Sequence, residues 1–305
     1  MGWLRVLDRH ATRFLAASVF LALALPDLAA LLRPLLAPAV WGILVLAMLR
    51  TDWAVLRGHL ARPRMIAASL VWLLLACPLV LWLGLRALGA ETSGVGQALV
   101  LAAAAPSLMS TPALAMIIGL DGALALVMML AAVFLAPFIL PFITLGLLGI
   151  EIELSVWEFA GRLIFVVGSA LGAAFIMRRR RVAALVKNSN GLMVILMLVF
   201  AVAIMDGVTG RLVAEPLYVA ALLAISFLFQ ALLQAATALG FLWLGRRAAL
   251  TVGFLAGNRN MGLLLAVLPA GLHPDVALYF ALAQFPIYIL PVLLKPLYAR
   301  LLAVK

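Results

Sequence analysis

An arginine between two asparagines interrupts one of the most apolar stretches of this sequence. Residues 251–271 read TVGFLAGNRNMGLLLAVLPAG, so that Gly257, Asn258, Arg259 and Asn260 follow one another inside a hydrophobic run. A guanidinium offers five N–H donors in a planar fork that suits carboxylates, and two amides add further donors and acceptors. A cation in apolar surroundings must meet an anion or backbone carbonyls. The pattern therefore indicates an anion-binding site or an arginine that locks the backbone, with the asparagines as solute contacts or as helix caps.

A second polar interruption lies in the run ALVLAAAAPSLMSTPALAMIIG, residues 98–119. Pro106 and Pro112 each remove a backbone donor, and the hydroxyls of Ser107, Ser110 and Thr111 can bond the freed carbonyls or a solute. Together with Gly257, these prolines are the predicted helix-break residues. The two interruptions supply the candidate substrate-binding residues Arg259, Asn260, Asn258, Ser107, Ser110 and Thr111.

The elements that must position these residues are membrane-spanning helices. The 305 residues are 68% hydrophobic and 11% charged, and the mean hydropathy is +1.25, which leaves too little polar surface for a soluble core. Apolar runs near the ~20 residues that cross a bilayer recur from end to end. They predict an all-α integral membrane protein with ten spans, at 14–32, 35–50, 64–85, 95–118, 122–148, 160–177, 191–207, 214–243, 248–270 and 275–302.

The first span has a second interpretation. Basic residues precede a short apolar run that ends in ALA at 22–24, which also resembles a signal peptide. Because the apolar run resumes at Leu28, we favour a tilted or partly interfacial helix.

The basic residues predict the topology, because cytoplasmic loops are enriched in Lys and Arg. Only Arg33, Arg86 and Arg211 fall on one side of the ten-span arrangement, while Arg162 and Arg259 lie inside spans. The other side carries Arg5, Arg9, Arg13, Arg50, Arg57, Arg62, Arg64, Arg178, Arg179, Arg180, Arg181, Lys187, Arg246, Arg247, Lys295, Arg300 and Lys305. We therefore expect a multi-pass protein of the cell (inner) membrane with both termini in the cytoplasm.

Several other functions are not indicated. The net charge of +11 is scattered over loops, so it does not predict nucleic-acid binding. The run MRRRR at 177–181 can touch anionic lipid or simply anchor the loop. Cys77 is the single cysteine and His10, His59 and His273 are dispersed, so no metal site is expected. Because no nucleophile and base are paired, we do not expect an enzyme.

The two interruptions occupy equivalent places in two halves of the chain, residues 1–150 and 151–305. Each half holds five spans, and the interruptions fall in the fourth and the ninth. Halves with an odd number of spans insert with opposite orientation, so these halves are predicted to be inverted repeats. Matched broken helices in inverted repeats point to the solute site of a transporter. The fifth and tenth spans also share proline pairs, Pro137 and Pro141 with Pro286 and Pro291, which indicate hinges or ordinary packing kinks.

The chain resembles the bile acid:sodium symporter family over nearly its whole length. The stretch from PDLAALLRPLLAPAVW to LVWLLLACP follows that family's first three helices, and APFILP matches its SPLLTP. The AP at 105–106 sits at its CPGGTASN motif, and GNRNMGL falls on its GMQNSGL. The resemblance implies ten helices, with a panel (helices 1, 2, 6 and 7) and a core (helices 3–5 and 8–10). Broken helices 4 and 9 would cross at the membrane midplane beside the substrate, and Asn260 matches a substrate-contacting asparagine.

The sequence departs from the family at the sodium sites. The fourth-helix ligands become Thr111 and Pro112, the ninth-helix acid becomes Leu255, its glutamine becomes Arg259, and the third-helix glutamine becomes Leu73. The fifth-helix hydroxyl positions fall on apolar residues around Ala125, Met129 and Leu130. Sodium prefers several hard oxygen ligands, so the sodium site looks degenerate and no cofactor is expected. We interpret Arg259 as the internal replacement for the cation.

These observations predict a secondary transporter that moves a small organic anion by alternating access without sodium coupling. Two alternatives stay open: a sodium symporter with a rebuilt cation site, and a non-transporting membrane receptor or scaffold. The expected partners are the organic anion and the lipid bilayer, not nucleic acid, and the oligomeric state is not indicated.

Overall fold

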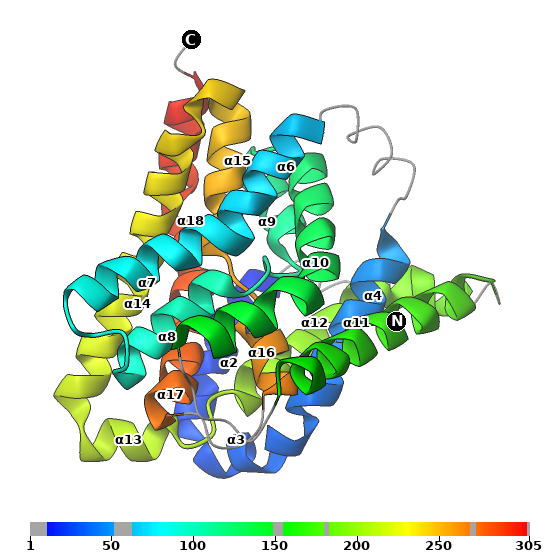
Figure 1. Cartoon of the computed structure of the whole chain (residues 1–305). Coiled ribbons are helices and arrows are strands. Elements are labelled where there is room, and N and C mark those ends of the chain that lie inside the picture. The colour runs from blue at the N-terminus through cyan, green and yellow to red at the C-terminus, as the bar shows by residue number, and fades with distance from the viewer. Residues whose placement is uncertain (1–10, 52–62, 149–154, 180–182, 269–272, 304–305) are drawn as a thin grey trace.

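The computed structural model describes residues 11–51, 63–148, 155–179, 183–268 and 273–303. Within these ranges the regular structure is helical, and no strand occurs (Figure 1). The prediction of an all-α membrane protein is confirmed at this level. Several residues named above lie outside the described ranges: Arg5, Arg9, His10, Arg57, His59, Arg62, Arg180, Arg181 and Lys305.

The first half of the chain forms helices on both sides of the first polar interruption. These are α2 (Ala11–Ala24), α3 (Pro26–Leu32), the 3-10 turn η1 (Arg33–Leu35), α4 (Leu36–Arg50), α6 (Pro63–Val71), the π-helical segment η2 (Trp72–Ala76), α7 (Cys77–Ala87), α8 (Gly94–Ala104), α9 (Thr111–Ile117) and α10 (Gly122–Leu148).

The second half of the chain forms helices on both sides of the second polar interruption. Its elements are α11 (Val156–Arg179), α12 (Ala183–Ala203), α13 (Val208–Ala214), α14 (Pro216–Gly240), the 3-10 turn η3 (Leu242–Leu244), α15 (Arg246–Gly257), α16 (Met261–Val267), α17 (Pro274–Leu282) and α18 (Gln284–Ala303).

Seven helical stretches among the described residues are long and apolar enough to cross a membrane. They match seven of the ten expected spans, and the first, fourth and ninth fall short. The fourth and ninth are interrupted. The first expected span, 14–32, is two helices, because Pro26 lacks an N–H and the chain bends at Leu25, where φ is −126° and ψ is 71°. Large apolar side chains such as Trp157, Phe165 and Leu217 remain 77%, 73% and 86% exposed, which suits a lipid-facing surface.

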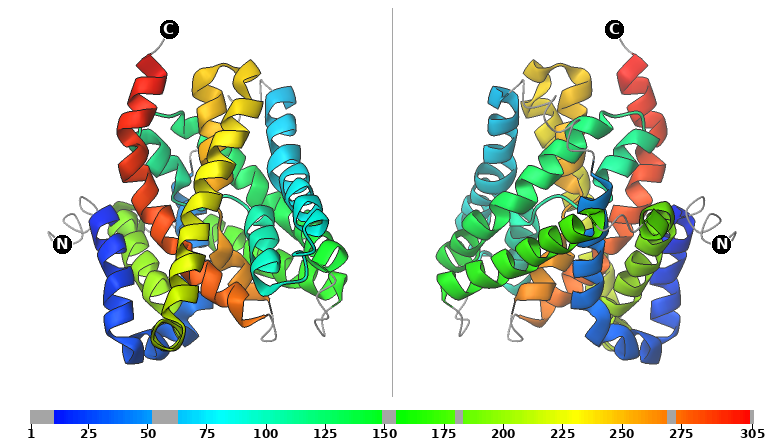
Figure 2. Two further views of the ribbon diagram at one scale, coloured as in Figure 1. Left: turned by 90° about the vertical axis from the view of Figure 1, so that its left-hand side faces the viewer. Right: turned by 90° about the vertical axis from the view of Figure 1, so that its right-hand side faces the viewer.

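The helices pack into two groups. The first helix group contains α2, α4, α11 and α12. In it, α4 contacts α11 and α12, and α12 contacts α2 (Figure 2). The second helix group contains α6 to α10 and α14 to α18, with α15 packed on α14 and α10, and α8 packed on α7 and α17. The groups touch where α10 meets α11, where α16 meets α4 and where α18 meets α2. The helices α10 and α18, which each hold two prolines inside the helix, belong to the second group.

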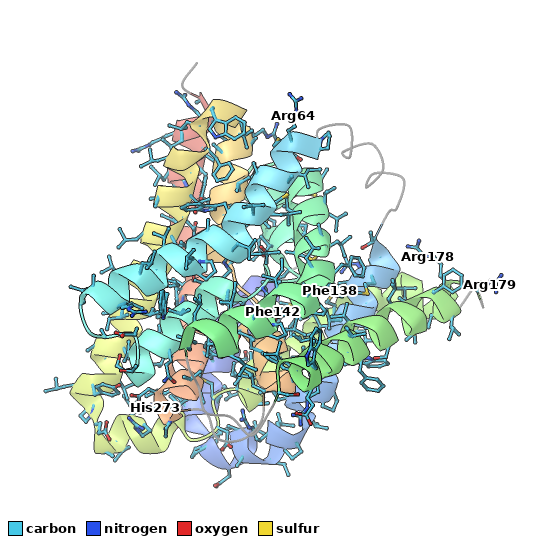
Figure 3. The ribbon with its side chains drawn as sticks, in the orientation of Figure 1. Arg64, Phe138, Phe142, Arg178, Arg179 and His273 are labelled. Atoms are coloured by element: carbon cyan, nitrogen blue, oxygen red, sulfur yellow. The ribbon has the colours of Figure 1, made fainter. Side chains whose placement is uncertain are left out.

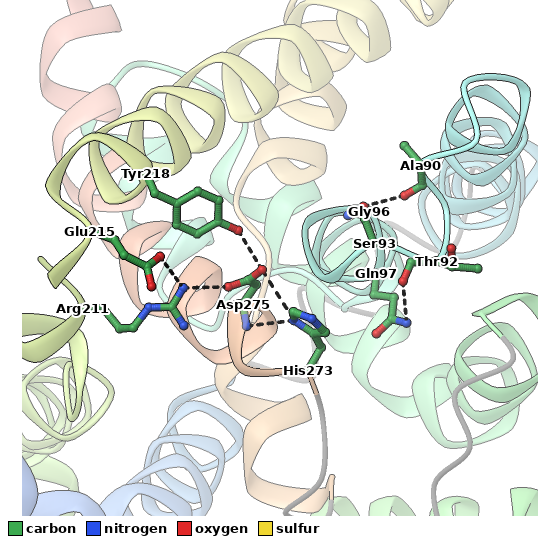
Figure 4. Close-up of polar contacts among 10 residues, drawn as sticks. All are labelled: Ala90, Thr92, Ser93, Gly96, Gln97, Arg211, Glu215, Tyr218, His273 and Asp275. Carbon is green, nitrogen blue, oxygen red and sulfur yellow. Dashed lines mark hydrogen bonds and ion pairs between the residues drawn. The ribbon is translucent and has the colours of Figure 1, made fainter.

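Polar and charged side chains gather at opposite ends of the molecule. Arg64 is at one end and His273 is near the other (Figure 3). At the Arg64 end, Arg246 Nη1 at the start of α15 donates to the carbonyl of Leu301 in the last turn of α18, at 3.3 Å. At the His273 end, Arg211 pairs with Glu215 and Asp275 at 3.1 and 3.2 Å, and the Tyr218 hydroxyl donates to Asp275 (Figure 4).

Candidate functional site

The two interrupted helices meet at their breaks. The amide of Leu108 donates to the carbonyl of Asn258 at 2.9 Å, and the amide of Asn260 donates to the carbonyl of Pro106 at 2.7 Å. These bonds form an isolated antiparallel bridge between Ser107 and Arg259. The bridge joins the end of α8 and the start of α9 to the end of α15 and the start of α16. The polar residues singled out from the sequence are therefore brought to one place.

Proline shapes the break between α8 and α9. Ala105 is extended, with φ −57° and ψ 143°, as expected for the residue before Pro106, and the helix ends there. Pro112 lies in the first turn of α9, where a missing N–H costs the helix nothing. Pro106 therefore sits at the break, while Pro112 favours the start of the next helix.

A close helix approach accompanies the break between α15 and α16. A Cβ atom on Gly257 would lie 2.4 Å from Gln234 Cγ, and one on Gly253 would lie 2.5 Å from the Gln234 carbonyl oxygen. Beyond the break, Asn260 Oδ1 accepts from the Leu263 amide at 3.2 Å and caps α16. Asn258 Nδ2 donates to the Phe254 carbonyl at 2.8 Å. Both asparagines thus stabilise helix ends.

Arg259 is the most deeply buried charged group of the site, at 1% exposure. Its Nε donates to the carbonyl of Ala256 at 2.6 Å, and its Nη1 donates to the carbonyls of Leu73 and Ala105 at 3.0 and 2.9 Å. Its Nη2 lies 3.8 Å from Cys77 Sγ. No described carboxylate pairs with it. The guanidinium therefore binds three backbone oxygens that come from three separate segments of the chain.

Each of these carbonyls is free for a local reason. The Cys77 amide donates to Trp72 in the π-helical segment η2 rather than to Leu73, and Pro78 has no N–H to offer. Ala105 precedes Pro106 at the end of α8, where carbonyls lack helix partners. The Asn260 amide, which would serve Ala256 in a continuous helix, bonds Pro106 instead. The chain thus gathers orphan carbonyls around a point, and Arg259 satisfies them.

The remaining hydroxyls differ in their surroundings. Ser107 Oγ donates to the carbonyl of Leu255 at 3.1 Å, which the break also frees. Ser110 Oγ and Thr111 Oγ1 are buried without a hydrogen-bond partner, and so is Asn258 Oδ1. Buried polar atoms of this kind are usually satisfied by a water or a ligand.

A cavity of about 460 Å³ lies between the two helix groups, beside the crossing of the breaks. Its walls come from α2, α4 and α12 of the first group and from α9, α10 and α18 of the second. A smaller cavity of about 20 Å³, the size of a single water, adjoins it. Ser110 and Tyr288 line both cavities, and Asn260 lines the smaller one. Arg259, Asn258, Ser107 and Thr111 line neither.

The structure also shows site residues that the sequence did not single out. Tyr288 has no motif that marks it, and Arg50 lines the large cavity although its position in the sequence indicated only a loop anchor. Gln234 of α14 accepts from the Tyr298 hydroxyl of α18 at 2.8 Å. Among the described residues no cluster of His, Cys, Asp or Glu is suited to hold a metal ion.

No family model matches the chain, and a search of curated proteins found no match either.

Proposed function

We propose that this protein is a secondary transporter for an organic anion, that it works by alternating access, and that it does not couple transport to sodium. The observation that carries the proposal is the guanidinium of Arg259 among the carbonyls of Ala256, Leu73 and Ala105. Converging carbonyl oxygens are what a bound alkali cation requires. Here the guanidinium of Arg259 supplies the positive charge beside these carbonyls, so no free cation is needed to satisfy the oxygens.

The cavity between the helix groups supports alternating access. A solute held between two groups of helices is exposed to one side or the other when one group moves against its partner. The proposed moving parts are a panel made of the first helix group and a core made of the second. The walls of the cavity are mainly apolar, which suits a solute with an organic body.

The proposed architecture is ten helices in two inverted repeats, residues 1–150 and 151–305, with the broken fourth and ninth helices crossing at the membrane midplane. Their matched positions in the two halves, and the bridge between Ser107 and Arg259, support this arrangement. The same features are the basis for proposing a relationship to the bile acid:sodium symporter family. The enrichment of Lys and Arg on one side of the expected ten-span arrangement supports cytoplasmic termini.

Accumulation in proteoliposomes tests the proposal. The purified protein is reconstituted, and uptake of radiolabelled pyruvate, succinate, benzenesulfonate and 2-naphthalenesulfonate is compared with uptake into protein-free liposomes. At least one anion is expected to enter faster with protein, and to exchange against the same unlabelled anion inside. Protein-independent entry of every anion tested would favour a non-transporting receptor or scaffold.

A sodium-coupled symporter is the second candidate, and one observation favours it. Thr111 Oγ1 and Asn258 Oδ1 are buried oxygens without partners, and a rebuilt cation site needs such oxygens. Replacing external sodium by choline separates the two mechanisms, because only a symporter loses uptake.

A further inference from the structure

The large cavity carries very little charge. Its lining includes five methionines, whose flexible thioethers adapt to varied apolar shapes. Among the described residues that line it, Arg50 is the one charged side chain, and Thr51, Ser110 and Tyr288 add hydroxyls. An ionised group in such a wall dominates the potential that an entering solute meets. The methionines are Met109, Met116, Met129, Met193 and Met197.

Within the part of the chain that the structure describes, the guanidinium of Arg50 has donors that no strong acceptor engages. Arg50 is the last residue of α4, is exposed, and lines the cavity. Among the described residues its side chain makes a single polar contact, from Nη1 to Met193 Sδ at 3.6 Å, and a thioether is a weak acceptor. No described carboxylate lies within ion-pair distance. Arg50 therefore differs from Arg259, whose donors are engaged by the backbone.

The backbone around Arg50 is held in place from α11. Arg178 Nη2 donates to the carbonyls of Leu49 and Thr51, at 2.8 and 2.6 Å, one on each side of Arg50. These bonds satisfy carbonyls at the end of α4 and fix the direction in which the Arg50 side chain leaves the helix. A positioned cation with unused donors at a cavity wall is suited to bind a carboxylate or sulfonate.

We propose that Arg50 contacts the negative group of the solute and makes the cavity selective for anions. This inference rests on the proposed function. It places the acid group of the solute at the α4 end of the cavity. Ile43 lines the small cavity together with Asn260, and seven residues of helix place Arg50 about 10 Å from it. The solute is then an anion whose apolar body extends from Arg50 along the methionines toward Ser110.

Cysteine labelling measures the potential in the cavity without a known solute. Ala123 lines the cavity and is partly exposed, whereas the native Cys77 is buried. In an Ala123→Cys variant, modification rates are compared for 2-sulfonatoethyl methanethiosulfonate, which is anionic, and its trimethylammonioethyl analogue, which is cationic. Adding Arg50→Gln should lower the ratio of the anionic to the cationic rate by about tenfold, since a unit charge in the wall of the same cavity acts oppositely on the two reagents.

Two further variants assign the effect to Arg50. Arg300→Gln, which removes a charge from the last turn of α18 outside both cavities, should leave the ratio unchanged. Arg259→Gln should change it less than Arg50→Gln does. An unchanged ratio in Arg50→Gln, or a larger fall in Arg259→Gln, would overturn the proposal.

Protection experiments test the contact itself. In Ala123→Cys, 2-naphthalenesulfonate should slow labelling at a concentration at least about tenfold lower than its neutral isostere naphthalene-2-sulfonamide requires. The difference should vanish with Arg50→Gln. Equal protection by the two compounds before that substitution would contradict the contact. If these results hold while no anion accumulates in proteoliposomes, the transport proposal fails and the anion site stands. If an anion accumulates in proteoliposomes but the labelling and protection results fail, the anion site at Arg50 is wrong and the transport proposal stands.

Discussion

At the scale of single residues, Arg259 is a cation whose guanidinium is hydrogen-bonded to the backbone and is not available for direct contact with an anion. Three carbonyls and a thiol surround its guanidinium, and it lines neither cavity. These contacts fit the interpretation of Arg259 as a structural lock, and its role as a functional charge stays a prediction. Because Arg259 lines neither cavity, its positive charge can act on a solute only through its electrostatic field. Removing the side chain would leave buried carbonyl oxygens without a donor.

Arg259→Gln is expected to lower the thermal stability of the purified protein. An amide reaches at most part of the carbonyl set, and each buried carbonyl left without a donor costs about 1–3 kcal/mol. The thermal stability of Arg259→Lys should fall between those of wild type and Arg259→Gln, since an ammonium keeps the charge but lacks the planar fork. Melting in detergent measures this, with Arg300→Gln as the matched loss of a surface charge. A melting temperature for Arg259→Gln equal to that of wild type would show that the carbonyls do not depend on the guanidinium.

Sodium is expected to restore part of the stability lost in Arg259→Gln. Without the guanidinium, the carbonyls of Ala256, Leu73 and Ala105 are available to a small cation, and a ligand that binds only the folded state stabilises it. Melting temperatures in sodium chloride and choline chloride at equal ionic strength make the comparison. The wild type should show no difference between the salts, and a variant indifferent to sodium would count against the cation-like character of the carbonyl cluster.

Ser107 and Ser110 form a matched pair that separates structure from function. Ser107→Ala removes the bond to the Leu255 carbonyl and should cost about 1 kcal/mol of stability. Ser110→Ala removes a buried hydroxyl without a partner from a residue that lines both cavities, so stability should be kept while anion uptake falls. Melting and proteoliposome uptake are measured on both variants. The opposite pattern, with Ser110→Ala the less stable protein, would exclude Ser110 as a solute contact.

At the scale of elements, the sequence predicts much of the helix pattern, but it does not predict the local geometry within an interrupted helix such as the π-helical segment η2. Charges, prolines and glycines punctuate the apolar runs, so the expected span 122–148 coincides with α10, and 248–270 with the broken pair α15 and α16. The two breaks were visible because polar residues are rare inside a membrane span and usually serve a specific role there. The π-helical segment η2 was not visible in the sequence, because Pro78 indicates a disturbed helix but not which carbonyl loses its partner. The partners of Arg259 depend on that carbonyl, so its role could not be decided from the sequence.

The contact between α14 and α15 depends on small residues at one helix face. Gly253→Ala would place a methyl group 2.5 Å from the carbonyl oxygen of Gln234, which the backbone of α14 cannot avoid without shifting. Overpacking of this kind costs about 1–3 kcal/mol. Gly168→Ala in α11 is the matched control, because nothing lies within 4 Å of its Cβ position. Melting temperatures of the two variants test the contact, and equal stability would mean that α15 has room to move away from α14.

At the scale of the whole molecule, two features of the second helix group lie beside the cavity between the groups. The breaks of two helices form one bridge, a buried guanidinium fills the carbonyl cluster beside it, and a cavity separates the first helix group from the second. The sequence could indicate the breaks and the charge. It could not indicate the cavity, because the apolar residues that line it, such as Met197 and Leu126, have the same character as those that face lipid.

The sodium dependence of uptake tests the central claim most directly. Initial rates of uptake of the transported anion are measured in proteoliposomes while external sodium is replaced stepwise by choline at constant ionic strength. If Arg259 takes the place of the coupling cation, the wild-type rate stays the same from full sodium to none. A rate that rises with sodium and disappears in choline would contradict this mechanism and leave Arg259 as a structural clamp in a sodium symporter.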